Sequence, residues 1–371
     1  MKNKILIVTK HPKSKGGVVN YYNHFFNVFQ SDDFELQWFT IGSRPGDYDN
    51  RLNRKWAYAL EFIVDILRFI HYLLKNNRRV KIVQISPSFF EIPLLRDTLY
   101  FLIAKLFRKK VIVFFRGWSK AFEKKIYKKS GIFKYVLKIL SKSNAVLILA
   151  FKFKEVLVHF GFSPNQIHVT RTMFVKTNIV DSNNKSEIKP LKYIFIARVS
   201  FQKGIIDIIE ALNLLNQKGL EICVDIYGHF ANSDIKISAD KLVKQYQLEN
   251  QIHFKGFING FEKYSKLSNA NVFLFPTFHD EGCPNSVIEA LASGLFVIAT
   301  PVGAIDELVV DKENGLIIPT RNPQKLAQAI LWTANNKETV LQIAKINKRY
   351  AYEQYEQEVM VSQIKKIYNT I

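Results

Sequence analysis

Cysteine is scarce in this sequence, because its 371 residues include only Cys223 and Cys283. This excludes a disulfide framework and a zinc site built from several cysteines, and it fits a reducing cytoplasm. Long apolar runs are missing too. The run Ile5–Val8 is too short for the apolar region of a signal peptide and predicts a buried first strand. Charged residues interrupt Tyr58–Leu74, which favours an amphipathic helix of the core over a membrane-spanning one.

Acidic residues are few in the first half of the chain. Residues 1–180 contain 32 Lys and Arg but only 11 Asp and Glu, a net charge of +21, whereas residues 181–371 contain 21 of each. The whole excess of positive charge therefore belongs to the first half. Such an asymmetry concerns partners and not the fold, and it predicts an anionic partner: a membrane surface, a phosphorylated lipid or a nucleic acid.

Short apolar strands alternate with helical patterns along the whole chain, which predicts the α/β class with mostly parallel sheets. The polar stretch Asp181–Glu187 separates two such alternations and is typical of a linker. We therefore expect two facing Rossmann-like domains with a cleft between them, over 1–180 and 190–350, and a C-terminal helix over 351–371 that crosses back to the first domain. The expected strands are 5–9, 35–39, 82–85, 111–115 and 145–150 in the first half, and 193–198, 222–227, 252–255, 272–276, 296–299 and 315–318 in the second.

A pair of cations follows the first strand of the second half. Arg198 ends that strand, and Lys203 stands five residues later beside Gly204, which opens a helix. In parallel α/β sheets ligands bind beyond the carboxyl ends of the strands, where helix N-termini offer free amides. This segment favours a phosphate site, although two surface cations near a helix start would look the same.

Two glutamates eight residues apart follow the strand 272–276. Glu281 stands in a loop and Glu289 in the next helix, roughly 12 Å further along its axis at about 1.5 Å per residue. Carboxylates suit sugars because they accept charge-assisted hydrogen bonds from hydroxyl groups. Alone, the pattern is as well explained by an ordinary acidic helix start.

The longer stretch around these glutamates resembles the retaining glycosyltransferases of family 4, of the bacterial surface-polysaccharide type. The family pattern of Glu, seven residues and Glu, then Ala-x-Ala-x-Gly, a strand and a glycine loop, matches 281–303, and the match continues to Gly315. Arg198 and Lys203 match the family's basic pair. The resemblance implies the GT-B fold, an acceptor domain over 1–180 and a nucleotide-sugar donor domain over 190–350.

The resemblance also implies roles for these residues. Glu281 would bond hydroxyls of the donor sugar and Glu289 the ribose, while Arg198 and Lys203 would neutralise the departing diphosphate without a metal cofactor. UDP-sugars are the expected donors, and the nucleobase would lie near 227–230 and 254–257. The remaining donor-binding residues expected on this basis are Gly17, Gly282, Cys283, Pro284, Asn285, Ser286, Tyr227, Gly228 and Phe257.

The sequence departs from the family at the end of strand 111–115. Many members carry a histidine there, but this chain has Arg116-Gly117-Trp118. Arg116 either replaces the histidine as a catalytic residue or is a structural cation stacked on Trp118. The general base is left unassigned, with His11 and His279 as further candidates beyond strand ends.

The basic half carries seven lysines between Lys124 and Lys142, interleaved with apolar and aromatic residues. This pattern predicts one basic helix at an anionic membrane surface, although a core helix with a solvated lysine face is the plain alternative. With the family's use of glycan and polyprenyl-diphosphate acceptors, it predicts a cytoplasmic enzyme held peripherally at the inner face of the plasma membrane. Asp47-Tyr48-Asp49 has the spacing of a metal-binding motif, but its polar loop favours a turn. A non-catalytic assembly subunit and a polyanion- or nucleic-acid-binding protein are the rival functions.

Overall fold

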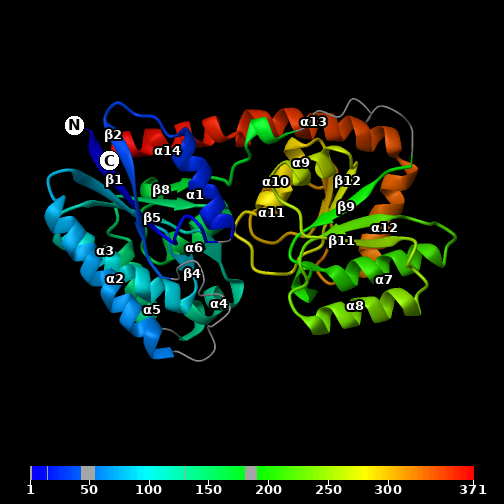
Figure 1. Cartoon of the computed structure of the whole chain (residues 1–371), viewed down its shortest axis with the longest axis horizontal. Coiled ribbons are helices and arrows are strands. Elements are labelled where there is room, and N and C mark those ends of the chain that lie inside the picture. Colours follow the sequence, from blue (N-terminus) through cyan, green and yellow to red (C-terminus); the bar gives the residue numbers. More distant parts are fainter. Residues whose placement is uncertain (1, 15, 43–54, 130, 180–189) are drawn as a thin grey trace. The chain divides into compact units, whose positions relative to one another are not determined.

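The chain divides into two compact units. The computed structural model describes residues 2–14, 16–42, 55–129, 131–179 and 190–371, so the predicted linker Asp181–Glu187 and the motif Asp47-Tyr48-Asp49 lie outside the described residues. One unit comprises Met1–Thr172 with Gln357–Ile371, and the other Met173–Glu356 (Figure 1). The first unit thus ends earlier than the expected limit at residue 180.

The first unit is built on a parallel six-stranded sheet with the order β2-β1-β3-β5-β7-β8. The central strands are buried on both faces, as a parallel sheet covered by helices on both sides requires. These strands are β1 (Asn3–Thr9), β2 (Phe34–Thr40), β3 (Val80–Ile85), β5 (Lys110–Phe114), β7 (Ala145–Ile148) and β8 (Ile167–Val169), and a separate pair is formed by β4 (Ser88–Phe89) and β6 (Gly117–Trp118).

Helices connect these strands. They are α1 (Gly17–Val28), α2 (Lys55–Lys75), α3 (Glu91–Leu106), α4 (Lys120–Lys129), α5 (Gly131–Leu140) and α6 (Lys152–His159). The prediction of one basic helix over 124–142 is wrong, since α4 and α5 are separate helices. Each of them turns an apolar residue inward, Ile126 from α4 and Leu137 from α5, and exposes an aromatic one, Tyr127 from α4 and Tyr135 from α5.

The second unit has the strand order β11-β10-β9-β12-β13-β14, again all parallel. Numbered within the unit this is 3-2-1-4-5-6, the doubly wound order of dinucleotide-binding domains. The strands are β9 (Tyr193–Ile196), β10 (Val224–Tyr227), β11 (Ile252–Gly256), β12 (Val272–Phe275), β13 (Phe296–Ala299) and β14 (Gly315–Ile317). Its helices are α7 (Ile205–Asn216), α8 (Ser233–Gln245), α9 (Gly260–Ser268), α10 (Asn285–Ala292), α11 (Ile305–Leu308), α12 (Pro323–Asn335) and α13 (Lys337–Tyr355).

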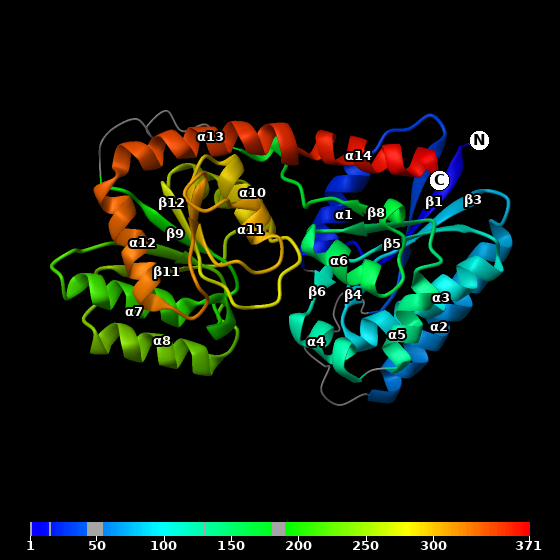
Figure 2. The ribbon, with the colours of Figure 1, turned by 180° about the vertical axis from the view of Figure 1, so that it is seen from behind.

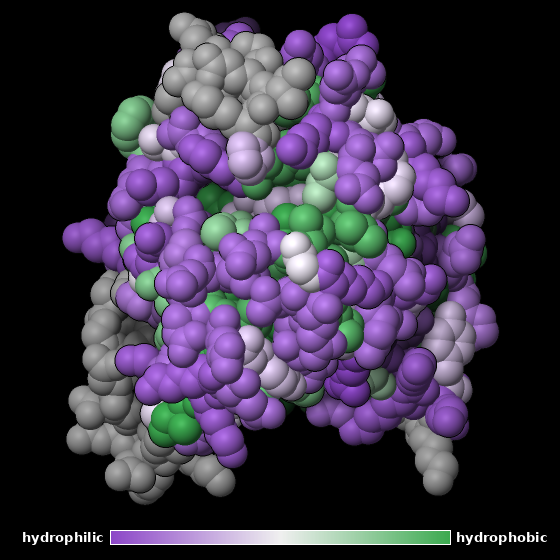
Figure 3. Space-filling model, turned by 90° about the vertical axis from the view of Figure 1, so that its right-hand side faces the viewer, coloured by the Kyte–Doolittle hydropathy of each residue, from purple (hydrophilic) through white to green (hydrophobic). Residues whose placement is uncertain are grey.

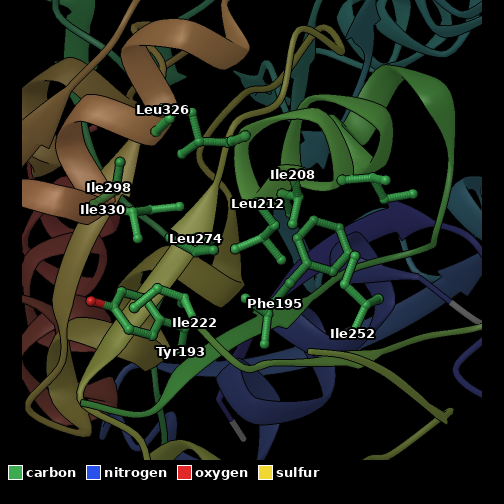
Figure 4. Close-up of a cluster of buried hydrophobic side chains, with 14 of the residues drawn as sticks. Tyr193, Phe195, Ile208, Leu212, Ile222, Ile252, Leu274, Ile298, Leu326 and Ile330 are labelled. Atoms are coloured by element: carbon green, nitrogen blue, oxygen red, sulfur yellow. The ribbon is translucent and has the colours of Figure 1, made fainter. Parts of the chain in front are cut away.

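Alternate residues of these strands face opposite sides of the sheet. Tyr193 and Phe195 of β9, Leu274 of β12 and side chains of α7, α8 and α12 form one fully buried cluster (Figure 4). Burying each large apolar side chain contributes about 1.5–3 kcal/mol. This core fixes the ends of β9 and β12, where the candidate site lies.

Figure 3 shows the molecule from the right-hand side of Figure 1. The surface on that side is largely hydrophilic, and hydrophobic residues are visible in places between the hydrophilic ones.

The C-terminal region consists of two helices. The first, α13, belongs to the second unit, and α14 (Gln357–Thr370) to the first (Figure 2). The Tyr368 hydroxyl of α14 donates a hydrogen bond to Gln84 of β3 at 2.8 Å, and the Gln84 amide donates to the Tyr22 hydroxyl of α1 at 2.9 Å. All three side chains are buried, so α14 is tied to the sheet of the first unit.

Candidate functional site

The candidate site lies where the strand order of the second unit reverses. The loops that follow β9 and β12 leave neighbouring strands at the same sheet edge, which is the usual ligand position in doubly wound sheets. The carbonyl of Gln202 in the first loop accepts hydrogen bonds from the amides of Phe278 and His279 in the second, at 2.9 and 3.1 Å. The two loops that carry the predicted site residues are therefore bound to each other.

Glycines let the backbone approach closely at this edge. A Cβ on Gly204 would lie 2.3 Å from the carbonyl oxygen of Pro276, and one on Gly303 would lie 2.3 Å from that of Glu281. Both glycines also have positive φ angles, 81° and 59°, which favour glycine. No larger residue fits at these positions without moving the loops. The glycines of the sequence pattern therefore fix the backbone that presents Lys203 and Glu281.

Lys203 and Glu281 form an ion pair across the two loops. Their side chains are only 18% and 14% exposed, and the ammonium also lies over the ring of Phe275, 5.3 Å from its centroid. His279 lies at the edge of this pair, with Nδ1 4.0 Å from the Glu281 carboxylate. Arg198 is exposed at the end of β9. The structure thus brings together Lys203 and Glu281, which stand 78 positions apart in the sequence.

Glu289 has partners that the sequence reasoning missed. It is 7% exposed on α10, and its Oε1 accepts hydrogen bonds from Lys263 Nζ at 2.6 Å and from the Tyr264 hydroxyl at 3.2 Å. Burial and the nearby Glu289 carboxylate raise the pKa of Tyr264, so this hydroxyl stays a donor. Lys263 and Tyr264 lie on α9, which packs against α10. Nothing in the sequence around Lys263 marks it, because the contact depends on how these two helices pack.

The start of α10 has no side-chain cap. Pro284 is its N-cap residue and accepts no hydrogen bond through a side chain. Amides of the first turn of a helix that lack a cap are a common binding site for anions. The preceding Gly282 accepts a hydrogen bond from Ala304 at 2.8 Å, and Cys283 is 7% exposed. Pro284 lies one position before the helix.

The expected nucleobase region holds an exposed aromatic pair. The His229 ring stacks on Phe257 with centroids 4.7 Å apart and planes at 7°, and Phe257 is 55% exposed. Tyr227, by contrast, is buried. A Cβ on Gly228 would lie 1.8 Å from the carbonyl oxygen of Ala197, so this glycine allows β9 and β10 to end side by side. Phe257 offers a ring surface, and His229, inside the predicted range 227–230, stacks on it.

In the first unit, Arg116 is 7% exposed and lies over the ring of Tyr21, 3.8 Å from its centroid. Trp118 stacks instead on Phe89 and Phe153. Arg116 therefore stacks on Tyr21 and not, as one alternative predicted, on Trp118. Its buried position favours the other part of that alternative, a structural cation.

The other predicted positions of the first unit lie near the first strand. Gly17 is the first residue of α1, and the Nδ1 of His11 accepts a hydrogen bond from the Lys13 amide.

Within the described residues no three metal-ligating side chains gather, and no helix there is long and apolar enough to cross a bilayer.

Part of the chain matches a known family. Residues 176–350 match the family described as Glycosyl transferases group 1. A candidate colanic acid biosynthesis glycosyltransferase, WcaL of Salmonella typhimurium, is 32% identical over 45% of this chain and 42% of its own length. The amylovoran biosynthesis glycosyltransferase AmsK of Erwinia amylovora is 24% identical over 62% of this chain and 57% of its own length. The chain thus spans about half the length of these relatives.

Solved structures resemble the whole chain in fold. The sucrose-phosphate synthase of Thermosynechococcus elongatus has a TM-score of 0.79 at 15% identity, over 100% of this chain and 99% of its own. Anabaena HepE in complex with UDP-glucose has a TM-score of 0.73 at 14% identity, over 99% of this chain and 100% of its own. The chain therefore has the GT-B fold, with two Rossmann-like domains, as the sequence predicted.

Proposed function

We propose that this protein is a glycosyltransferase that moves a hexose from a nucleotide-sugar to an acceptor with retention of configuration. The Lys203–Glu281 pair at the switch point carries the proposal, because it joins a cation suited to phosphate and a carboxylate suited to sugar hydroxyls. The polysaccharide-biosynthesis names of the relatives support a role in cell-surface polysaccharide synthesis. HepE was solved with UDP-glucose, which supports a UDP-sugar as donor.

In this mechanism the bound donor breaks the ion pair between Lys203 and Glu281 and gives each side chain a new partner. The diphosphate takes Lys203 and the exposed Arg198, and this frees the Glu281 carboxylate to accept hydrogen bonds from the sugar hydroxyls. Cleavage of the sugar–phosphate bond builds negative charge on the diphosphate. Preorganised cations and the uncapped amides of α10 stabilise that charge as it develops. The partial burial of the pair strengthens these interactions relative to water.

The nucleoside extends from this point toward α9. Lys263 and Tyr264 hold Glu289 Oε1, which leaves Oε2 to accept hydrogen bonds from the ribose hydroxyls. The base stacks on Phe257, whose ring His229 supports from one side. The parts of the bound donor then follow one another along the site in the order base, ribose, diphosphate and sugar.

The acceptor is proposed to be a glycan or a polyprenyl-diphosphate-linked sugar, reached through the first unit. The excess of positive charge in residues 1–180 supports an anionic acceptor or surface. The protein would then work peripherally at the cytoplasmic face of the membrane.

Calorimetry with UDP, GDP, ADP and their hexose conjugates tests the donor site. We expect wild-type protein to bind one nucleotide series, and Glu289→Ala to bind it at least about tenfold more weakly, a loss of about 1.4 kcal/mol. The exposed Glu249→Ala is the matched control and should bind like wild type. If no nucleotide binds to any of the three proteins, the catalytic proposal fails, and the assembly-subunit and polyanion-binding functions take its place.

A further inference from the structure

The first unit carries an exposed apolar surface that the donor chemistry does not use. Ten large aliphatic side chains of α2 and α3 are exposed by 38–81%. We define the α2–α3 face by these residues: Leu60, Ile63, Val64, Leu67 and Leu74 of α2, and Ile92, Leu95, Leu99, Leu102 and Leu106 of α3. Single exposed leucines are normal, but ten exposed aliphatic side chains on two packed helices indicate an interaction surface.

The spacing shows that this surface is a second apolar stripe. On α3 the exposed residues recur every three or four positions from Ile92 to Leu106, which places them on one side of the helix. The core-facing side of α3 is formed by other residues, among them Leu94 and Phe101. Helix α3 is therefore apolar on two sides, and the described residues of its own unit cover only one of them.

A cavity of about 550 Å³ lies beside α2 and α3 and reaches Lys10 and Ile41 beyond β1 and β2. Its lining includes Phe62 of α2 and Ile92, Leu95 and Leu99 of the α2–α3 face, and its volume falls within the roughly 300–1,000 Å³ of small-molecule sites. The hydroxyl of Tyr100, which also lines it, is buried and has no hydrogen-bond partner among the described residues. Lys10, Glu61, Asp65 and Arg96 line it as well, so the hollow beside the face mixes apolar and charged side chains.

Exposed cations lie near the α3 side of the face. Arg108 and Lys110 follow the end of α3 and are exposed, and α5, which packs on α3, exposes Lys134 and Lys138. A second copy of the chain would bring the same positive charges to the interface and repel. A bilayer with anionic lipids satisfies both features, because it offers hydrocarbon to the leucines and phosphate to the cations.

We propose that the α2–α3 face docks the protein onto an anionic lipid bilayer. The proposal extends the peripheral role given above and rests on it. It moves the predicted membrane contact from the lysine-rich segment 124–142 to two helices that expose aliphatic side chains. The lysines of α5 then supply the charge beside this contact.

Flotation of the full-length protein with vesicles tests this docking surface. We expect wild-type protein to float with vesicles of phosphatidylcholine and phosphatidylglycerol at least about tenfold more than with phosphatidylcholine alone. The exposed positions allow Ile92→Gln, Leu99→Gln and Leu106→Gln to be combined without opening the core, and this variant should lose about tenfold in binding to anionic vesicles. The combination Ile237→Gln and Ile346→Gln, at exposed positions of the second unit, is the control.

Three further measurements separate the alternatives. Lys134→Gln with Lys138→Gln should reduce the preference for anionic vesicles. Sedimentation should give the same molecular mass for wild type and the triple variant, and UDP binding should be unchanged. Equal flotation of the triple variant and wild type, or a wild-type dimer that the triple variant abolishes, would overturn the docking proposal. If wild-type protein floats as expected but binds no nucleotide, the proposed function fails while the docking surface stands.

Discussion

Replacing Lys263 by methionine tests how the second glutamate of the site is held. The change removes the 2.6 Å ion pair to Glu289 and keeps a side chain of similar length. The two side chains are 21% and 10% exposed, so part of the interaction is screened by water. A hydrogen bond to a charged group contributes about 1.5–3 kcal/mol. We therefore expect a loss of roughly 1–2 kcal/mol in the free energy of unfolding.

This loss should appear in two assays. The melting temperature should fall by roughly 2–8 °C, given about 2–4 °C per kcal/mol for a domain of this size. The Kd for the nucleotide should rise about tenfold, because Glu289 would keep only the Tyr264 hydroxyl and would no longer present Oε2 in one position. Lys266→Met, an exposed lysine of the same helix, is the control and should change neither value. An unchanged Kd and melting temperature in Lys263→Met would refute the assignment of Lys263 as a positioning residue.

Three other changes probe the surroundings. Gly303→Ala should abolish nucleotide binding, because the added Cβ would meet the carbonyl oxygen of Glu281. Gly219→Ala is the control and should bind normally, because Gly219 also has a positive φ angle but open space around it. Equal binding by both variants would contradict the close packing at Gly303. Arg116→Met should lose about 2 kcal/mol of stability and keep its turnover; lost turnover at an unchanged melting temperature would instead place Arg116 at the substrate. Burial, with help from Glu210, raises the pKa of Asp207 to about 6. The folded state thus holds this proton more tightly than the unfolded one, so stability should fall as pH rises from about 4 to about 6. Asp207→Asn should remove that loss and melt higher than wild type at pH 7; an unchanged pH profile would show that Asp207 does not cause it.

Much of the fold could be predicted because strands and helices alternate with clear turn signals. The strands 296–299 and 272–276 were placed within one residue, since continuous apolar runs mark strands buried on both faces. Strand β8, Ile167–Val169, was missed because it has only three residues and a histidine at its centre. The expected C-terminal helix over 351–371 was also inexact, since α13 continues to Tyr355 before α14 begins. Periodicity does not show where a helical pattern is interrupted by a single extended residue such as Glu356.

The site was predictable where one loop carries it. Glu281, Gly282 and Glu289 stand close together in the sequence and could be recognised as one motif. Lys263 and His229 lie on other elements, and their contacts with the site are not visible in the sequence. Their partners are fixed by the packing of α9 on α10 and by the ends of β10 and β11. The exposed stripe of α2 shows the same limit, because an amphipathic pattern reveals an apolar side without showing what covers it.

Titration of a UDP-hexose and of UDP into wild type and Glu281→Gln tests the donor site most directly. The account predicts that wild type binds the UDP-hexose more tightly than UDP. Glu281→Gln should keep its affinity for UDP, since Lys203 remains for the diphosphate, and should lose roughly tenfold in its preference for the sugar conjugate. If Glu281→Gln keeps the full preference, the carboxylate does not bind the sugar, and the assignment of the Lys203–Glu281 pair to donor recognition is contradicted.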